Sequence, residues 1–252
     1  MSRPWGKGLN RKHTLGEIMR DEFHAALEAL VEDLADMCGR ASALVDAASA
    51  ALLNGDIAAA DRVTFDLKRL TRLGNAVHDR AYSMLALQAP VARDLRAVVA
   101  ALYIAADADR MGGLAANVAR TACRRYPDCV VPDDVRDLFA EMSSTAVELA
   151  EMVQATVRLR DANLARRVCD GDGRMNDLHR ELFARLMSPQ WRHGPTVAAD
   201  LVLLGRFYER FADHAVEIAR RAHFQVTGAQ LAGGGDERGI AHQNPSAHPL
   251  PR

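Results

Sequence analysis

An internal repeat constrains this chain more than any other feature. Residues 109–120 read DRMGGLAANVAR, and one hundred positions later residues 209–220 read ERFADHAVEIAR. Both copies start with an acid and an Arg, carry a central Ala, and end in a branched apolar residue followed by Ala-Arg. A repeat at such a spacing indicates that one structural unit occurs twice. The sequence therefore predicts two copies of a single unit.

Apolar residues recur every three or four positions through most of the chain, which places them on one face of an α-helix. The pattern and its breaks predict six helices, over about residues 14–53, 56–88, 90–126, 132–160, 162–187 and 196–226. In the third helix the residues predicted to form the apolar stripe are Leu95, Val98, Val99, Leu102 and Ala106. No segment alternates with a period of two, so no sheet is expected.

Three long helices joined by short loops pack as an antiparallel bundle. The predicted fold is therefore all-α, with two tandem three-helix bundles. The first bundle is expected to span 14–127 and the second 131–228. Residues 1–13 and 229–252 are expected to be flexible termini, because the last segment is rich in Gly, Pro, Gln and His and has no periodicity.

The composition argues against a nucleic-acid-binding protein and against a membrane-spanning one. The net charge is −1 and the charges are interspersed, which argues against nucleic acid as a partner because phosphate binding needs a concentrated basic surface. The four cysteines are scattered, as expected of free thiols in a reducing cytoplasm. No apolar run reaches the roughly 18–20 residues that span a bilayer. We therefore expect a cytoplasmic protein without membrane insertion.

The second copy of the repeat carries three carboxylates on one helical face. Glu209, Asp213 and Glu217 lie at i, i+4 and i+8. Like charges at this spacing destabilise a helix by roughly 0.2–0.5 kcal/mol per pair unless a cation compensates them. Two interpretations stay open. Arg206, Arg210 and Arg220 can pair with these acids at the surface, or the acids can form a site for a hard or borderline metal cation.

The first copy has fewer acids. Its equivalent positions are Asp109, Gly113 and Asn117, so the middle carboxylate is missing. Gly112 and Gly113 each destabilise a helix by about 1 kcal/mol relative to Ala. A Walker loop, a Gly-x-Ser-x-Gly elbow and a His-Glu-x-x-His motif are all absent from the sequence. The chain is therefore predicted not to be an enzyme.

Both copies resemble the pattern Glu-Arg-x-Gly-Asp-x-Ala-x-Asn-Ile-Ala of the PhoU family, the accessory regulators of phosphate-specific transport. The first copy has Asp109 for Glu and Gly113 for Asp, whereas the second keeps Glu209, Arg210 and Asp213. The strings at 85–96, 191–194, 203–214 and 224–228 are similar to actinobacterial members in particular.

The resemblance implies a cytoplasmic, all-helical protein, often a homodimer, that restrains phosphate uptake when phosphate is plentiful. Such proteins are thought to link the ATPase component of the phosphate ABC transporter to a sensor histidine kinase. Family members hold iron or zinc clusters on the acidic faces. Carried over by position, the metal-ligand candidates are Glu209, Asp213 and Asp109, with Asp172 and Asp66 as weaker additions.

Two departures from the family pattern fall in the first copy, Gly113 and Thr71, which both stand where many relatives have an acid. The sequence therefore predicts a competent second metal site and a degraded first one. Two alternative functions are a helical, carboxylate-rich metal-binding protein or metalloenzyme, and a set of amphipathic helices that lie on a membrane. The latter needs a basic face with aromatic anchors, and only 5% of the residues are aromatic.

Overall fold

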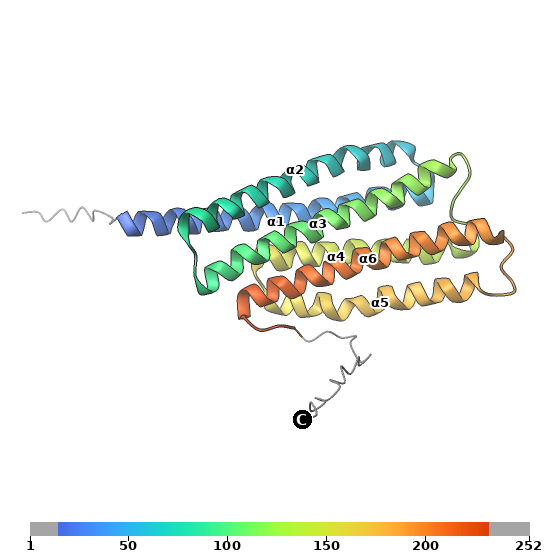
Figure 1. Cartoon of the computed structure of the whole chain (residues 1–252). Helices are drawn as coiled ribbons and strands as arrows, with labels where there is room; N and C mark the ends of the chain where they lie inside the picture. The colour runs from blue at the N-terminus through green and yellow to red at the C-terminus, as the bar shows by residue number, and fades with distance from the viewer. Residues whose placement is uncertain (1–14, 232–252) are drawn as a thin grey trace, which may run out of the picture.

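The computed structural model describes residues 15–231 and shows six long α-helices (Figure 1). Their bounds are Leu15–Asn54 (α1), Ile57–Gln88 (α2), Ala92–Arg125 (α3), Asp133–Leu159 (α4), Ala162–Leu186 (α5) and Gly194–Thr227 (α6). Between residues 15 and 231 there is no strand. The predicted all-α class and the six helices are confirmed.

The helix boundaries follow from local chemistry. Asp56 caps α2, where its carboxylate accepts a 2.9 Å hydrogen bond from the backbone N–H of Ala59. Asp161 caps α5 in the same way, accepting from Asn163 N–H at 2.7 Å. Gly228 ends α6 with φ of 73°, a left-handed conformation that glycine adopts without a steric cost. Capped ends of this kind keep successive helices separated by short loops.

The helices form two three-helix bundles that lie side by side (Figure 1). One bundle contains α1, α2 and α3, and the other contains α4, α5 and α6. Helix α1 packs against α4, and α3 packs against α6 (Figure 1). The chain runs in opposite directions along α3 and α6 (Figure 1). A single hydrophobic core runs through both bundles, and Leu30, Met111, Phe139 and Tyr208 are among its fully buried side chains. The two motif helices, α3 and α6, therefore meet at the centre of the molecule.

One part of the predicted core is exposed. Val98 is fully buried as predicted, but Leu95 is 41% exposed and Val99 is 36% exposed. The bundle covers the face of α3 that carries Val98 and leaves the neighbouring stripe uncovered. The prediction that Leu95 and Val99 face the core is therefore wrong, because apolar periodicity marks a stripe without showing which stripe the neighbouring helices cover.

Of the termini expected to be flexible, residues 1–13 and 232–252 lie outside the described residues. Residues 229–231 follow the end of α6 closely. The backbone N–H of Ala229 donates to Thr227 Oγ1 at 3.1 Å, and Leu231 packs against the core. Within residues 15–231, no helix combines the length and the apolarity that crossing a bilayer requires.

Candidate functional site

The second acidic motif brings carboxylates from two helices together. Glu209 and Asp213 come from α6, and Asp172 comes from the neighbouring helix α5. Partial desolvation raises the pKa of Asp213, although the residue as a whole is exposed, and the charges of Asp172 and Glu209 raise it further. Burial also raises the pKa of Asp172, with a smaller upward contribution from Glu209. The three predicted ligands of this motif are therefore close enough to repel one another.

Cations compensate this repulsion only in part. Arg206 forms an ion pair with Glu209, and His179 Nδ1 lies 3.5 Å from a carboxylate oxygen of the same residue. Asp172 accepts a 2.9 Å hydrogen bond from the amide of Asn176. Asp213 forms no ion pair with any residue between 15 and 231. Of the three surface pairs considered from the sequence, Arg206 with Glu209 and Arg220 with Glu217 form, the latter at 3.7 Å.

The donor set of the second motif fits a metal cation in its chemistry. Asp172, Glu209 and Asp213 supply the oxygen ligands that hard and borderline divalent cations prefer. Two of the three acids carry raised pKa values, the electrostatic condition that a bound cation relieves. Their arrangement does not form a metal site as it stands, because across residues 15–231 no three His, Cys, Asp or Glu side chains are close enough together to hold an ion. These three acids would have to reorient to ligate one together.

The first motif presents a different surface. Asp109 accepts a 2.8 Å hydrogen bond from Thr71 Oγ1 of α2, so these two positions face each other. A Cβ atom added at Gly113 would meet no atom within 4 Å, which leaves open space where the second motif has Asp213. Asp66 forms a 3.5 Å ion pair with Arg69 of its own helix. In the first motif, therefore, the carboxylate of Asp109 faces a hydroxyl group rather than a second carboxylate.

A buried ion cluster joins the two motif helices. Asp107 of α3 is only 3% exposed. Its carboxylate lies 3.1 Å from His214 Nδ1 and 3.3 Å from Arg221 Nε, both on α6, and 3.3 Å from Arg110. Burial alone would raise the pKa of Asp107, but the hydrogen bond and charge of His214, together with the two arginines, outweigh it and hold that pKa below its usual value.

Sequence reasoning missed this cluster. Asp107 sits among apolar residues on the buried face of α3, and a lone polar residue in such a stripe has no partner visible in the sequence. The only available signal was that a buried carboxylate needs a cation. His214 and Arg221, both on α6, are its partners. A depression of about 410 Å³ lies between this cluster and the second motif, lined by Asp107, Asp172 and Asp213 among others.

Comparisons with known proteins agree with the repeat. The PhoU domain family matches the chain twice, over residues 34–122 and 139–222. The protein named phosphate-specific transport system accessory protein PhoU homolog 2 of Mycobacterium tuberculosis is 47% identical over 211 residues, which cover 84% of this chain and 99% of that protein. PhoU homolog 1 of Mycobacterium leprae is also 47% identical, over 84% of this chain and 95% of that protein.

Two solved structures share the fold. The crystal structure of PhoU from Pseudomonas aeruginosa superposes with a TM-score of 0.72 at 24% identity, covering 82% of this chain and 100% of that one. The phosphate transport system regulatory protein PhoU from Streptococcus pneumoniae superposes with a TM-score of 0.74 at 18% identity, covering 83% of this chain and 99% of that one. At these identities the likeness concerns the fold alone.

Proposed function

The chain belongs to the PhoU family, and we propose that it is a negative regulator of phosphate uptake and of phosphate-starvation signalling. It is an accessory regulatory protein of phosphate-specific transport rather than an enzyme. The observation that carries the proposal is the double family match, which falls on both halves of the repeat. The 47% identity to a named PhoU homolog, over 99% of that protein, supports it.

The proposed regulation works by binding to other proteins. One partner is the ATPase component of the phosphate ABC transporter, and the other is a sensor histidine kinase, with the protein acting as a cytoplasmic homodimer. Two rigid bundles with a shared core suit this role, because they present long charged helix faces without requiring a catalytic centre. Each half of the repeat can then offer its own surface to a partner.

The second motif is the proposed metal site. Asp172, Glu209 and Asp213 would hold an iron or zinc ion, which would neutralise their mutual repulsion and fix α5 against α6. Support comes from their grouping on two packed helices and from the raised pKa values of Asp172 and Asp213. The first motif is proposed to hold none, since Gly113 and Thr71 supply no carboxylate beside Asp109.

A deletion experiment tests the regulatory proposal. The gene is deleted and the expression of phosphate-starvation genes is followed in phosphate-rich medium. We expect these genes to switch on and the wild-type chain to restore their repression. Continued repression in a strain that also lacks any second PhoU-like gene would contradict the proposal.

A further inference from the structure

An exposed apolar stripe runs along the first half of α3. Leu95, Val99 and Tyr103 follow one another at i, i+4 and i+8, and Tyr103 is 52% exposed. At 1.5 Å per residue the stripe is roughly 12 Å long, about two helical turns. Single exposed apolar residues are ordinary, but a contiguous exposed stripe marks an interaction surface.

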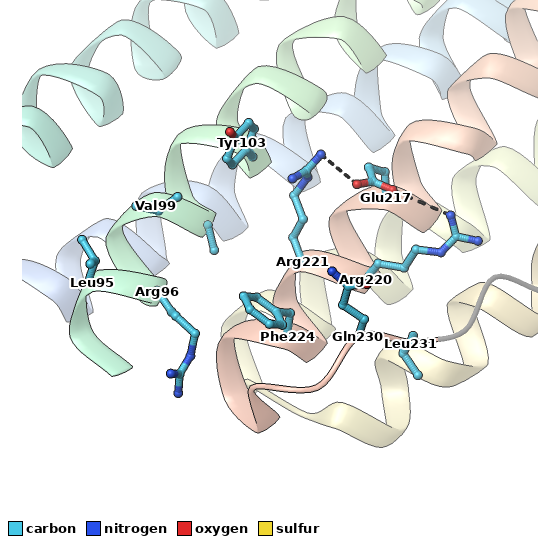
Figure 2. Close-up of a pocket in the computed structure, with 11 residues that line it drawn as sticks. Leu95, Arg96, Val99, Tyr103, Glu217, Arg220, Arg221, Phe224, Gln230 and Leu231 are labelled. Atoms are coloured by element: carbon cyan, nitrogen blue, oxygen red, sulfur yellow. Dashed lines mark ion pairs between the residues drawn. The ribbon is translucent and has the colours of Figure 1, made fainter. Parts of the chain in front are cut away.

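The stripe forms one wall of a groove. Phe224 of α6 and Leu231, just beyond α6, lie across from it, and the groove between them has a volume of about 490 Å³ (Figure 2). We call this feature, lined by Leu95, Val99, Tyr103, Phe224 and Leu231, the α3–α6 groove. An open apolar channel between two helices is the shape that an amphipathic helix fills with its own apolar face.

Arginines line the same groove, and two of them have unused donors. Arg96 forms no ion pair with any residue that the structure describes, and its Nε is buried without a hydrogen-bond partner. The Nε of Arg220 is also buried and unpartnered, although its guanidinium lies 3.7 Å from Glu217. A guanidinium with an unpaired charge beside an apolar stripe favours an occupant that carries a carboxylate.

The third arginine is already engaged. Arg221 pairs with Glu217 at 2.7 Å (Figure 2). It also pairs with Asp107 at 3.3 Å, and its guanidinium lies 4.4 Å from the centre of the Tyr103 ring. This contact fixes Tyr103 at one end of the stripe. The free positive charge of the groove therefore lies with Arg96, since Arg220 and Arg221 both pair with Glu217.

The repeat supplies a related surface whose chemistry differs at the matching positions. One hundred positions on, Ala199 stands in place of Val99, and Asp200 stands in place of Ala100. Asp200 pairs with Arg125 at 2.8 Å through Nε and with Arg124 at 3.5 Å. Arg124 itself occupies the position equivalent to Phe224. The repeat-related surface also exposes an apolar side chain, Leu203, but its Arg124 and Arg125 both pair with Asp200, whereas in the α3–α6 groove Arg96 forms no ion pair with a described residue.

We propose that the α3–α6 groove docks an amphipathic helix of another protein. The apolar face of that helix covers Leu95, Val99 and Tyr103, and its Asp or Glu side chains pair with Arg96. The inference rests on the proposed function, because a regulator that acts by binding must present such a surface. It adds the location of one docking site and the chemistry of its partner.

Site-specific photocrosslinking tests this assignment. A photoreactive benzoylphenylalanine replaces Val99 in the full chain, expressed in its own host in phosphate-rich medium, and the crosslinked peptide is identified by mass spectrometry. We expect an acidic segment of another protein with apolar residues at helical spacing. The same substitution at Ala199 is the matched control and should yield at most about one tenth as much of that product.

A charge reversal separates the guanidinium contact from general effects. Arg96→Glu, added to the Val99 crosslinker variant, should lower the yield about tenfold, whereas Arg93→Glu, which makes the same charge change outside the groove, should leave it within about twofold. Circular dichroism confirms that both variants fold. A crosslink to a second copy of this chain or to a basic segment would overturn the proposal, as would equal effects of the two charge reversals.

The groove and the regulatory role can fail separately. If deletion of the gene derepresses phosphate-starvation genes but Val99 captures no acidic helix, the groove assignment is wrong and the regulatory proposal stands. If Val99 captures such a helix and deletion changes nothing, the docking site is supported and the phosphate role is wrong.

Discussion

The two copies of the motif occupy equivalent helices of equivalent bundles and yet carry different chemistry. The second copy groups Asp172, Glu209 and Asp213, with two of their pKa values raised. The first copy offers Asp109, bonded to the hydroxyl of Thr71. Both copies keep the apolar positions that build the core. The shared apolar register is enough to give both halves the same helices, and the acids differ between them because they are not needed for the core.

The buried ion cluster should contribute most to stability, because Asp107 is almost fully buried. It also distinguishes the two copies, since the position equivalent to Asp107 holds the apolar Phe207. Asp107→Ala leaves His214 and Arg221 without their carboxylate in the interface between α3 and α6. We expect the free energy of unfolding to fall by about 2–3 kcal/mol, somewhat below the usual cost of breaking a buried pair because Arg221 is partly exposed. Urea denaturation at neutral pH measures it.

A nearby acid provides the control for Asp107→Ala. Asp109→Ala, two residues away, removes only a hydrogen bond to Thr71 and should cost about 1 kcal/mol or less.

The contribution of the cluster to the free energy of unfolding should also depend on pH. Since the pKa of Asp107 is lowered by folding, its stabilising contribution is present above the ordinary value of 3.8 and is lost as pH falls through the lowered value. Equal losses for the two variants would show that the cluster does not hold the helices together.

The adjacent glycines of the first motif give the next largest effect. A Cβ at Gly112 would lie 2.4 Å from Leu70 Cδ2 in the packed core, whereas a Cβ at Gly113 meets no atom within 4 Å. Gly113→Ala should therefore stabilise the chain by about 0.5–1 kcal/mol through helix propensity. Gly112→Ala should be at least about 1 kcal/mol less stable than Gly113→Ala. Thermal and urea unfolding compare the two, and equal stabilities would contradict the packing described for α2 against α3.

The smallest effect comes from the charges of the second motif. Because folding raises the pKa of Asp172 and Asp213, their ionisation destabilises the folded state above the raised values, and the penalty disappears as pH falls below 3.8. Asp172→Asn with Asp213→Asn should stabilise the metal-free chain at pH 7 by less than about 1 kcal/mol, since Asp213 is exposed to solvent.

Chelator-treated protein is used to measure this charge effect by urea unfolding at pH 7 and at pH 3. Asp66→Asn, an exposed and ion-paired acid of the first bundle, serves as the control and should change stability by no more than about 0.5 kcal/mol. A loss of stability for the double variant in metal-free buffer would mean that the carboxylates stabilise the fold rather than strain it.

The sequence predicted the helices well because apolar spacing, Asp caps and Gly or Pro breaks are local signals. It placed Glu209 and Asp213 on one face for the same reason. It missed Asp107 and its partners, because a contact between residues 107 positions apart depends on how α3 meets α6. It also assigned Leu95 and Val99 to the core, since periodicity does not show where neighbouring helices stop covering a face.

Metal titration of three metal-free proteins tests the asymmetry most directly. Zn²⁺ and, without oxygen, Fe²⁺ are titrated into the wild-type chain, into Asp109→Ala and into Glu209→Ala with Asp213→Ala, and bound metal is counted by elemental analysis. We expect the wild type and Asp109→Ala to bind alike and the double variant to bind at least about 100-fold more weakly, since even the loss of residues that only orient metal ligands can weaken binding that much. Metal retained by the double variant, or lost from Asp109→Ala, would contradict the assignment of the site to the second motif.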